Sequence, residues 1–452
     1  MDIAVDLHSH SMFAGGSGGL STSKESLAEN MKKAHKRFLQ ADANSLLKGI
    51  QVLGSGDIQF GPWLDFFKQD FEEENGLFVL KDGGTGELRY LLQTEVIITA
   101  ELSKKKRKSV HTVILFPHYE AIQEFKQLLT KFEVKQEKLA RPFVVLQDNQ
   151  NVSDFLYKVT EIDNMIEIIP AHVMTPEGVY GGNNGVNTLD SFFGEFGNEL
   201  TTFETGLSAD PVILSLIPEL DNKTLLSNSD AHSAQLHRIG REFTVLDMNQ
   251  LSYNSIVDSL RNQKIAYSLE FPVTEGRFFL TGHRAGRKKP GAHNTDQYCY
   301  FSPEHVPKDN ICPICNKKLT KGVLQRAFEI SKSQGEERTL DQSEITQKFL
   351  HGVPLTEVIA GALQIKSSDS KTVLKHYKDV IAVFGNEVNL WRAEYDKVEP
   401  VIPKKLPASI RDAILMIKQE KFGFSPPGFD GTYGSLVFGE KQDFFGHNVI
   451  QN

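Results

Sequence analysis

Asp6-Leu7-His8-Ser9-His10 follows the apolar run that opens the chain, and Asn228-Ser229-Asp230-Ala231-His232 ends a long region of similar pattern. In a strand, residues i and i+2 point to the same side, so His8 and His10 can reach one metal ion together. Imidazole nitrogens and carboxylate oxygens are the ligands that zinc and manganese accept. The two stretches therefore predict a metal-dependent hydrolase.

Between these stretches, short β-branched runs alternate with segments of helical spacing, the pattern of repeated βα units around a parallel sheet. Polar residues cluster at or just after the ends of these runs, and in α/β barrels the loops that follow the strands converge on one face. Residues 1–272 are therefore predicted to form an α/β barrel with its active site on that face. The expected strands are Ile3–Leu7, Ile50–Leu53, Leu91–Ile98, Thr112–Phe116, Met165–Ile169, Thr201–Glu204, Thr224–Ser227 and Phe243–Leu246.

The candidate metal ligands share one position, because each ends or follows an apolar run. A single histidine at a strand end is more often a hydrogen-bonded residue than a ligand. A whole set is harder to dismiss, since buried carboxylates are costly without cations to compensate them. The candidates are His8, His10, Asp57, Glu95, His111, His172, Asp230 and His232.

Length and composition narrow the class of protein. A chain of 452 residues predicts one large domain with smaller ones attached. Its net charge of −8 argues against a protein coated with basic residues for indiscriminate nucleic-acid binding. The sequence has no apolar run long enough to span a bilayer, and the acidic opening strand is unlike a signal peptide. We therefore expect a cytoplasmic protein with no membrane partner.

The cysteines predict a second metal site. Three cysteines cannot all pair, and Cys312-Pro313-Ile314-Cys315 has a spacing that suits a metal better than a disulfide. Cys299 adds a third thiolate, and either His293 or His305 completes a tetrahedral zinc set. We favour His293 as the fourth ligand, because its spacing before Cys299 is like that of a zinc knuckle. Residues 273–325 are thus expected to form a zinc-binding module.

Residues 326–452 are expected to be a mainly helical C-terminal domain. Four segments have helical spacing, the first of which spans the expected boundary at residue 326. Polar or Pro-bearing connectors separate them. The end of the chain is too rich in Gly, Pro and aromatic residues for a helix, and finishes in the strand-like Ser435–Phe438. The expected helices are Leu324–Ser333, Leu355–Leu363, Lys371–Phe384 and Ile410–Gln419.

The ordered set of ligands resembles the polymerase and histidinol phosphatase (PHP) superfamily of metal-dependent phosphoesterases over about the first 270 residues. The resemblance implies a distorted (βα)7 barrel with two or three metal ions. It places His8, His10, Glu95 and Asp230 in one site, with Glu95 bridging to a second site made with His111 and His172, and it assigns His232 to a third. Two divalent ions about 3.5–4 Å apart can stabilise the attacking and leaving oxygens at phosphorus. The catalytic candidates are Glu95, Asp230 and His232; Asp230 or His232 can pass a proton to the departing alkoxide.

The sequence departs from that family in two places. Gly15 stands where many members have a further histidine, and Asp57 is followed by Ile58 rather than by histidine. A third metal ion is therefore in doubt, unless Asp57 itself replaces the missing imidazole. We expect zinc in the cysteine module and at the catalytic site of the barrel, with Mn²⁺ or Mg²⁺ as alternatives at the catalytic site.

The barrel, the CxxC module, residues 205–211 (Thr-Gly-Leu-Ser-Ala-Asp-Pro) and residues 428–434 (Gly-Phe-Asp-Gly-Thr-Tyr-Gly) together resemble the endonuclease Q family over nearly the whole chain. The resemblance implies a DNA-repair endonuclease. It would nick DNA on the 5′ side of hypoxanthine, xanthine, uracil or an abasic site, with the altered base flipped into a pocket. DNA is the implied partner, and a sliding clamp is left open. The alternative is a small-molecule phosphatase of the histidinol-phosphate type, which would not need the residues beyond the barrel.

The expected DNA contacts come from a basic segment and an aromatic residue. Arg284-Ala285-Gly286-Arg287-Lys288-Lys289 is one of two basic segments, Lys104–Lys108 being the other, and each is equally well explained as a solvated turn. Tyr433 is a candidate for stacking on a base, although such aromatics are more often part of a local core. The predicted DNA-binding residues are Arg284, Arg287, Lys288, Lys289 and Tyr433.

Overall fold

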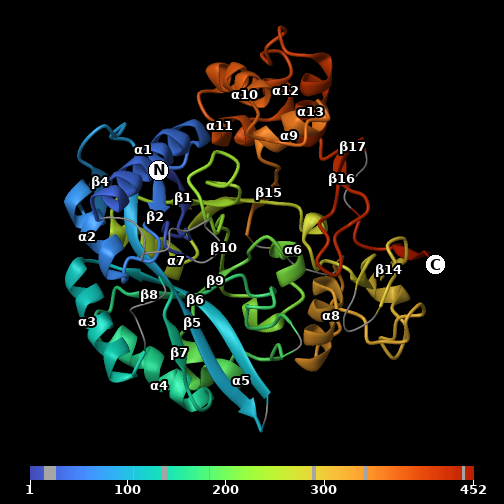
Figure 1. Ribbon diagram of the computed structural model, residues 1–452, viewed down its shortest axis with the longest axis horizontal. Helices are drawn as coiled ribbons and strands as arrows, with labels where there is room; N and C mark the ends of the chain where they lie inside the picture. The colour runs from blue at the N-terminus through green and yellow to red at the C-terminus, as the bar shows by residue number, and fades with distance from the viewer. Residues whose placement is uncertain are drawn as a thin grey trace.

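The protein is described from a computed structural model (Figure 1). The structure describes residues 1–14, 27–104, 106–134, 140–182, 184–287, 292–340, 345, 347–439 and 443–451. Gly15, Lys105, Lys288 and Lys289, which enter the sequence predictions, lie outside the described residues.

A large mixed sheet forms the centre of the protein, so the predicted α/β class is confirmed. Within the described residues this sheet has eleven strands. Each of the eight strands expected in residues 1–272, the barrel, has a counterpart, six in this sheet and two in a smaller one. Seven repeats of the βα unit remain a prediction. The strands of this sheet are β1 (Asp2–Asp6), β2 (Val52–Gly54), β3 (Phe71–Glu74), β4 (Leu77–Leu80), β5 (Arg89–Ser103), β6 (Lys106–Phe116), β7 (Phe143–Val145), β8 (Glu167–Pro170), β11 (Phe243–Asp247), β12 (Ile265–Glu270) and β15 (Phe349–His351).

The expected all-parallel pairing is wrong for part of this sheet. β1 is parallel to β2, and β2 to β5, but β5 pairs with β6, β6 with β8, and β1 with β11 in antiparallel fashion. β5 and β6 form one long hairpin because only residues 104 and 105 separate them, whereas a parallel crossover needs a dozen residues or more. Figure 1 shows this hairpin extending beyond the body of the sheet.

Two shorter strands, β9 (Thr202–Glu204) and β10 (Thr224–Leu226), pair with each other in parallel. The backbone N–H of Val173, just after β8, donates to the Glu204 carbonyl at 3.1 Å, which joins β9 to the β8 side. On the other side, the Leu7 N–H donates to the Asn228 side chain at 2.6 Å. The segments that follow β1, β8, β9 and β10 are thereby brought to one place.

Helices cover the outside of the sheet. Their ends follow ordinary capping rules: the Asp148 carboxylate accepts from the Asn151 N–H at the start of α4, and the Ser252 hydroxyl does the same for Ser255 in α7. Their buried faces pack on the sheet in a core that is rich in Phe, Leu, Ile and Val. These helices are α1 (Leu27–Lys48), α2 (Gly61–Asp70), α3 (Tyr119–Lys131), α4 (Asn149–Thr160), α5 (Asp190–Phe193), α6 (Pro211–Leu214) and α7 (Tyr253–Arg261).

A small module lies beside the barrel, at the right of Figure 1. Its three-stranded sheet is built from β13 (Thr281–His283), β14 (Tyr298–Phe301) and β18 (Asn448–Gln451), all antiparallel. β18 comes from the C-terminal end of the chain, so residues from two expected domains share this sheet. Helix α8 (Val323–Ser333) leaves the module and packs its buried face into the same core as the barrel.

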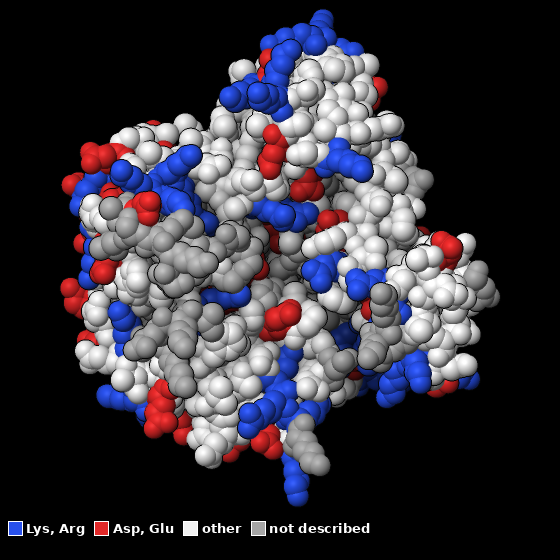
Figure 2. Space-filling view, in the orientation of Figure 1, with Lys and Arg blue, Asp and Glu red and all other residues white. Residues whose placement is uncertain are grey.

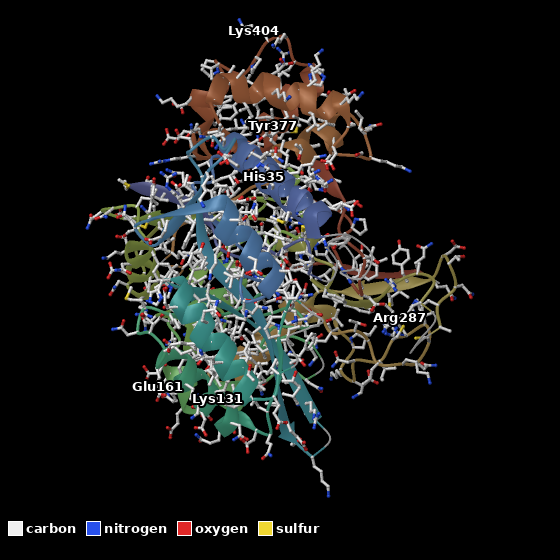
Figure 3. The ribbon with its side chains drawn as sticks, turned by 60° about the vertical axis from the view of Figure 1, so that its left-hand side comes forward. His35, Lys131, Glu161, Arg287, Tyr377 and Lys404 are labelled. Carbon is white, nitrogen blue, oxygen red and sulfur yellow. The ribbon has the colours of Figure 1, made fainter. Side chains whose placement is uncertain are left out.

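The C-terminal helices form a dome above the barrel (Figures 1 and 3). The helices predicted in this region are confirmed within two residues. The dome packs on the barrel through apolar residues of β11 and β12, and the Tyr377 hydroxyl donates to the Leu47 carbonyl of α1 at 3.2 Å. Beneath the dome, the buried Lys48 ammonium lies 3.0 Å from the Glu387 carboxylate. The dome consists of α9 (Leu355–Ala362), α10 (Lys371–Phe384), α11 (Glu387–Arg392), α12 (Tyr395–Val398) and α13 (Ala408–Lys418), with the hairpin β16 (Phe422–Phe424) and β17 (Leu436–Phe438) beside it.

Two strands connect the expected domains to one another. β15, which precedes the dome, pairs in parallel with β12 of the barrel, and β18 returns to the module. The boundaries at residues 272 and 325 remain predictions. Among the described residues, no helix is long and apolar enough to cross a membrane.

Candidate metal centre and active site

Five segments of the barrel bring their polar side chains to one place. His8 and His10 follow β1, His172 follows β8, and Asp230 follows β10. Glu95 and His111 lie within the long β5–β6 hairpin rather than at strand ends, on adjacent strands whose register pairs Glu95 with Val113 and His111 with Ile97. The sequence set these residues up to 222 positions apart, and the fold collects them into one buried cluster.

Glu95 is the centre of this cluster. Its side chain is fully buried. Its Oε1 atom lies 2.5 Å from His111 Nδ1, 3.7 Å from His172 Nε2 and 3.8 Å from His8 Nε2. Its Oε2 atom lies 3.5 Å from His10 Nε2. One carboxylate thus faces histidines on both sides, which is the arrangement expected of a bridging ligand.

Asp230 and His232 complete the other side of the cluster. Asp230 Oδ1 lies 2.9 Å from His10 Nε2 and 3.6 Å from His8 Nε2. The His232 ring lies 4.3 Å from that of His10, centroid to centroid, and its Nδ1 is 3.5 Å from Asp230 Oδ1. The potential ligand atoms fall into three overlapping groups: His8, His10 and Glu95; Glu95, His111 and His172; and His10, Asp230 and His232.

The state of these atoms fits metal binding. His8 Nε2, His10 Nε2, Glu95 Oε1, His111 Nδ1 and Asp230 Oδ1 are all buried and lack a hydrogen-bond partner of good geometry. A buried polar atom without a partner is costly, and such atoms are rare in native proteins unless an ion or a water completes them. Five of them that face one another are explained if cations bind between them.

The outer nitrogens of the two opening histidines are held by carboxylates. His8 Nδ1 lies 2.8 Å from Glu204 Oε2, and His10 Nδ1 lies 3.3 Å from Asp57 Oδ1. A carboxylate at one ring nitrogen fixes the tautomer, so that the other nitrogen keeps its lone pair for a metal. In each ring the Nε2 atom is therefore the one that faces the cluster.

Asp57, a predicted metal ligand, lies behind His10. The carboxylate accepts from the Ser11 N–H at 2.7 Å and contacts the far side of His10. Among the described residues it joins none of the groups that could hold an ion. Both of its oxygens contact the loop after β1, and its role as a metal ligand stays a prediction.

Glu204 is a further candidate site residue that was not predicted from the sequence. It is fully buried at the end of β9, and besides His8 it accepts from the Asn228 amide at 3.2 Å. Its other oxygen, Oε1, lacks a hydrogen-bond partner. The only signal in the sequence was its place at the end of a predicted strand, which it shares with the recognised ligands.

The charges of the cluster stabilise one another. Burial alone would lower the pKa of His8, but the Glu204 and Asp230 carboxylates raise it to about 9. Burial alone would raise the pKa of Glu95, but contacts with His111, His172 and His10 hold it well below its usual range. Glu95 is thus kept ionised, which is the form that binds a cation, and a cation bound beside His8 would take the place of the proton that these carboxylates favour on its ring.

Three residues of the site have left-handed backbone conformations. The φ angles are 45° for Asp57, 32° for His172 and 47° for Asp230. Residues other than glycine seldom adopt this backbone conformation. Those that do are concentrated at functional sites, where the surrounding structure holds them. Gly206 makes this possible beside His172, since a Cβ atom there would lie 2.4 Å from the His172 Cβ.

A cavity of about 480 Å³ lies over the cluster. His111, His172, Asp230 and His232 form its floor, together with Glu204. Arg141 lies at its wall with Nη1 2.8 Å from Glu95 Oε2. The opposite wall comes from beyond the barrel and includes Glu275, Gly276, Arg277, Phe278 and Tyr433. The cluster is therefore open to a ligand on one side.

The module contains another group of residues that could hold a metal ion. His293, Cys312 and Cys315 lie together as predicted, and His283 from β13 is the fourth residue whose ligand atom is close to all the others. His293 Nε2 is 3.3 Å from Cys312 Sγ, and His283 Nδ1 is 3.4 Å from Cys315 Sγ. Cys299 is buried with its Sγ 3.5 Å from Cys312 Sγ, and the structure places it at the edge of this group.

Backbone carbonyls orient both histidines of the module. His293 Nδ1 lies 2.9 Å from the Gln297 carbonyl, and His283 Nε2 lies 2.8 Å from the Lys318 carbonyl. A ring nitrogen next to a carbonyl carries the proton, so the opposite nitrogen of each ring faces the thiols unprotonated. Two imidazoles and two thiols are a tetrahedral zinc set. His305, the other histidine considered, lies on the surface beside Glu304.

The predicted DNA contacts have different surroundings. Tyr433 is 53% exposed at the mouth of the cavity, with the Arg277 guanidinium 5.6 Å from its ring. Arg284 is exposed. Arg287, by contrast, is largely buried, and its Nη1 donates to Asp430 at 2.7 Å and to Thr320 at 2.8 Å. Its first role is to bind the module to the C-terminal segment.

Comparisons with known proteins support a relationship over much of the chain. No protein-family model matches it. The chain is 24% identical over 407 residues to the uncharacterized protein YqxK of Bacillus subtilis, which covers 86% of this chain and 89% of that protein. It is 27% identical over 258 residues to the uncharacterized protein MJ0043 of Methanocaldococcus jannaschii. That match covers 56% of this chain but 30% of the larger relative.

The fold and the cluster define a mixed α/β protein with a buried histidine and carboxylate centre that opens into a cavity. Two solved structures share this fold over nearly the whole chain. One is the lesion-specific endonuclease PfuEndoQ of Pyrococcus furiosus, with a TM-score of 0.74 and 23% identity over 97% of this chain and 96% of that one. The other is endonuclease Q in complex with a 27-mer duplex substrate with an abasic lesion at the active site, with a TM-score of 0.73 and 22% identity over 99% of both chains. The chain has the endonuclease Q fold.

Proposed function

We propose that this protein is a metal-dependent DNA endonuclease that cleaves beside damaged nucleotides. The observation that carries the proposal is the group of buried, unpartnered ligand atoms on the floor of a cavity whose walls include the module and the C-terminal segment. The likeness to endonuclease Q structures, which spans the barrel, module and dome together, supports it.

The residues of the cluster have distinct parts in this proposal. His8, His10, Glu95, His111, His172 and Asp230 would hold the ions, with His232 at the edge of the same group. Divalent ions bound there would supply Lewis-acid stabilisation of the charge that develops on the phosphoryl oxygens. Glu204 and Asp57 fix the tautomers of the two opening histidines. Asp230 or His232, both on the cavity floor, would pass a proton to the departing alkoxide.

Arg141 supplies positive charge from the protein itself. One of its nitrogens is held by Glu95, and the side chain forms part of the cavity wall. A guanidinium presents several donors in a rigid fork that matches phosphate oxygens. We place the phosphate of the cleaved bond between Arg141 and the floor of the cavity.

The proposed substrate is DNA that carries a deaminated base, such as hypoxanthine, uracil or xanthine, or an abasic site, cut on the 5′ side. A duplex does not enter a cavity of about 480 Å³, so the altered nucleotide would be flipped out of the helix. The exposed Tyr433 ring beside Arg277 at the mouth of the cavity is suited to stack on a base. Zinc is the proposed ion of the module, and zinc, Mn²⁺ or Mg²⁺ that of the cluster.

The test is a nicking assay on a panel of labelled duplexes, each with one altered base, one abasic site or none. With divalent metal, a nick should appear beside at least one lesion and not in the intact duplex. Asp230→Asn should abolish it, whereas Asp412→Asn, an equal change on the exposed face of α13, should not. Intact DNA across the whole panel would refute the proposal.

The same assay separates the phosphatase alternative. A histidinol-phosphate type of enzyme would hydrolyse a small phosphomonoester and leave every duplex intact. A small phosphomonoester would not need residues beyond the barrel. Part of the cavity wall comes from such residues, so the cavity does not favour that substrate. The sliding clamp gains no support from the comparisons, so the proposal is confined to DNA as the partner.

A further inference from the structure

The cavity over the metal cluster is the first of three that adjoin one another. It shares Pro176 and Phe278 with a second cavity of about 200 Å³. The second shares Gly182 and Arg326 with a third of about 490 Å³, which lies between the module, α8 and the loop that follows His172. Together they form a row of neighbouring cavities from the cluster to the edge of the module.

The two ends of this row differ in charge. Next to the cluster, carboxylates such as Glu177, Glu204 and Glu275 line the cavity along with two arginines. The third cavity is lined by four cations, Arg287, Lys318, Lys321 and Arg326, against one carboxylate, Asp309. We call these four residues the basic groove. It stands out in a chain whose net charge is −8.

The two arginines of the basic groove are held in place by the protein. Arg326 donates to the carbonyls of Tyr180 and Val186 at 2.9 and 2.7 Å. Arg287 is fixed by Thr320 and Asp430. Figure 3 shows Arg287 in the module, away from the dome. Side chains that are already ordered lose little conformational entropy when they meet an anion.

The two lysines are exposed and available to exchange partners. Lys318 is on the surface, while its backbone carbonyl contacts the module histidine His283. Lys321 pairs with Glu329, but both side chains are more than a third exposed, and such surface pairs contribute little. In Figure 2, Lys and Arg side chains gather on the lower edge of the module and at the end of the β5–β6 hairpin.

We propose that the basic groove binds the phosphate backbone of a DNA strand several nucleotides from the cleaved bond. This inference rests on the proposed function and extends it by assigning the path of the substrate strand. Lys318 and Lys321 contact phosphates, and Arg326 and Arg287 form the rigid wall behind them. Contacts of this kind position the DNA and carry no sequence or lesion information.

The test compares two double variants of equal charge change. Lys318→Ala with Lys321→Ala removes the exposed cations of the basic groove; Lys397→Ala with Lys404→Ala removes two exposed lysines of the dome. Figure 3 shows Lys404 at the tip of the dome, far from the module. Both pairs are made in an Asp230→Asn background, and binding to an abasic duplex is measured by fluorescence anisotropy from low to high salt.

We expect the groove variant to lower the slope of log affinity against log salt by about 1–2, since each phosphate contact contributes about 0.9. The affinity should fall equally for damaged and intact duplexes, and the dome variant should match the parent. An unchanged slope, or a loss confined to damaged DNA, would overturn the inference. In that case nicking by the unaltered protein would leave the proposed function standing; without nicking or DNA binding, both fail.

Discussion

The part of the chain that the structure describes has two histidine-rich clusters, and they differ in what surrounds them. The barrel cluster combines five histidines with Glu95 and Asp230 beneath an open cavity. The module cluster combines two histidines with two thiols, and Cys312 packs in a small core with the buried side chains of Cys299, Phe301 and Leu319. A closed set of four ligands is typical of a structural zinc site, whereas an open site rich in carboxylates is typical of a catalytic one. We therefore expect histidine to serve two purposes here, a structural one in the module and a catalytic one in the barrel, distinguished by the second ligand type and by solvent access.

The largest effect is expected from the barrel cluster. His10→Ala should lower the nicking rate by at least about a thousandfold, because it removes an inward ligand shared by two of the three groups. The fold should survive, since the cluster lies at the edge of an intact core. Nicking and circular dichroism, measured on the same preparation, check both parts. A variant that cuts normally would show that the cluster is not the reaction centre.

Cys312→Ser should have the opposite profile. Cys312 Sγ contacts both His293 and Cys299, so its loss should remove one equivalent of bound zinc and lower the unfolding temperature. The ions of the barrel cluster should stay. Metal analysis by mass spectrometry, before and after the change, measures this. Loss of ions from both clusters would contradict their independence.

A smaller effect is expected from the residues behind the ligands. Glu204→Gln should weaken metal binding about 10–100-fold, because the amide no longer fixes the tautomer of His8 as a carboxylate does. Added metal should then restore much of the nicking rate, as it should for Asp57→Asn. Metal titrations against Asp230→Asn, which excess metal should not rescue, distinguish orientation from ligation.

The smallest effect concerns stability and pH. Glu270 is fully buried near β9, and burial raises its pKa from 4.5 to about 7 in spite of hydrogen bonds from Ser227 and Ser268. A raised carboxyl pKa stabilises the fold below about pH 4.5 and loses that contribution as the pH rises through about 7. Glu270 should therefore lower the free energy of unfolding by roughly 3 kcal/mol across this range. Glu270→Gln should flatten the curve in denaturant titrations, and an unchanged curve would exclude Glu270 as the source.

Much of the barrel was predictable because its strands are short apolar runs bounded by polar residues. Their direction was not, since Leu91–Ile98 and Thr112–Phe116 are parts of longer strands whose polar outer halves form an exposed hairpin. Candidate ligands such as His8, His172 and Asp230 could be found from their positions after strands, whereas Glu95 and His111 lie within β5 and β6. Asp57 shares that position but faces the other side of His10, and only the fold reveals this. The candidate ligand His283 could not be predicted from the sequence. It has no characteristic spacing from the CxxC cysteines, and only the folding of β13 brings it to their thiols.

The most direct test of the account is anomalous diffraction from crystals of the metal-loaded protein. We predict at least two peaks among His8, His10, Glu95, His111, His172 and Asp230, and one zinc peak among His283, His293, Cys312 and Cys315. Asp57 and Glu204 should lie behind the histidines, out of contact with any ion. A barrel cluster without a peak in the presence of excess metal would contradict the account.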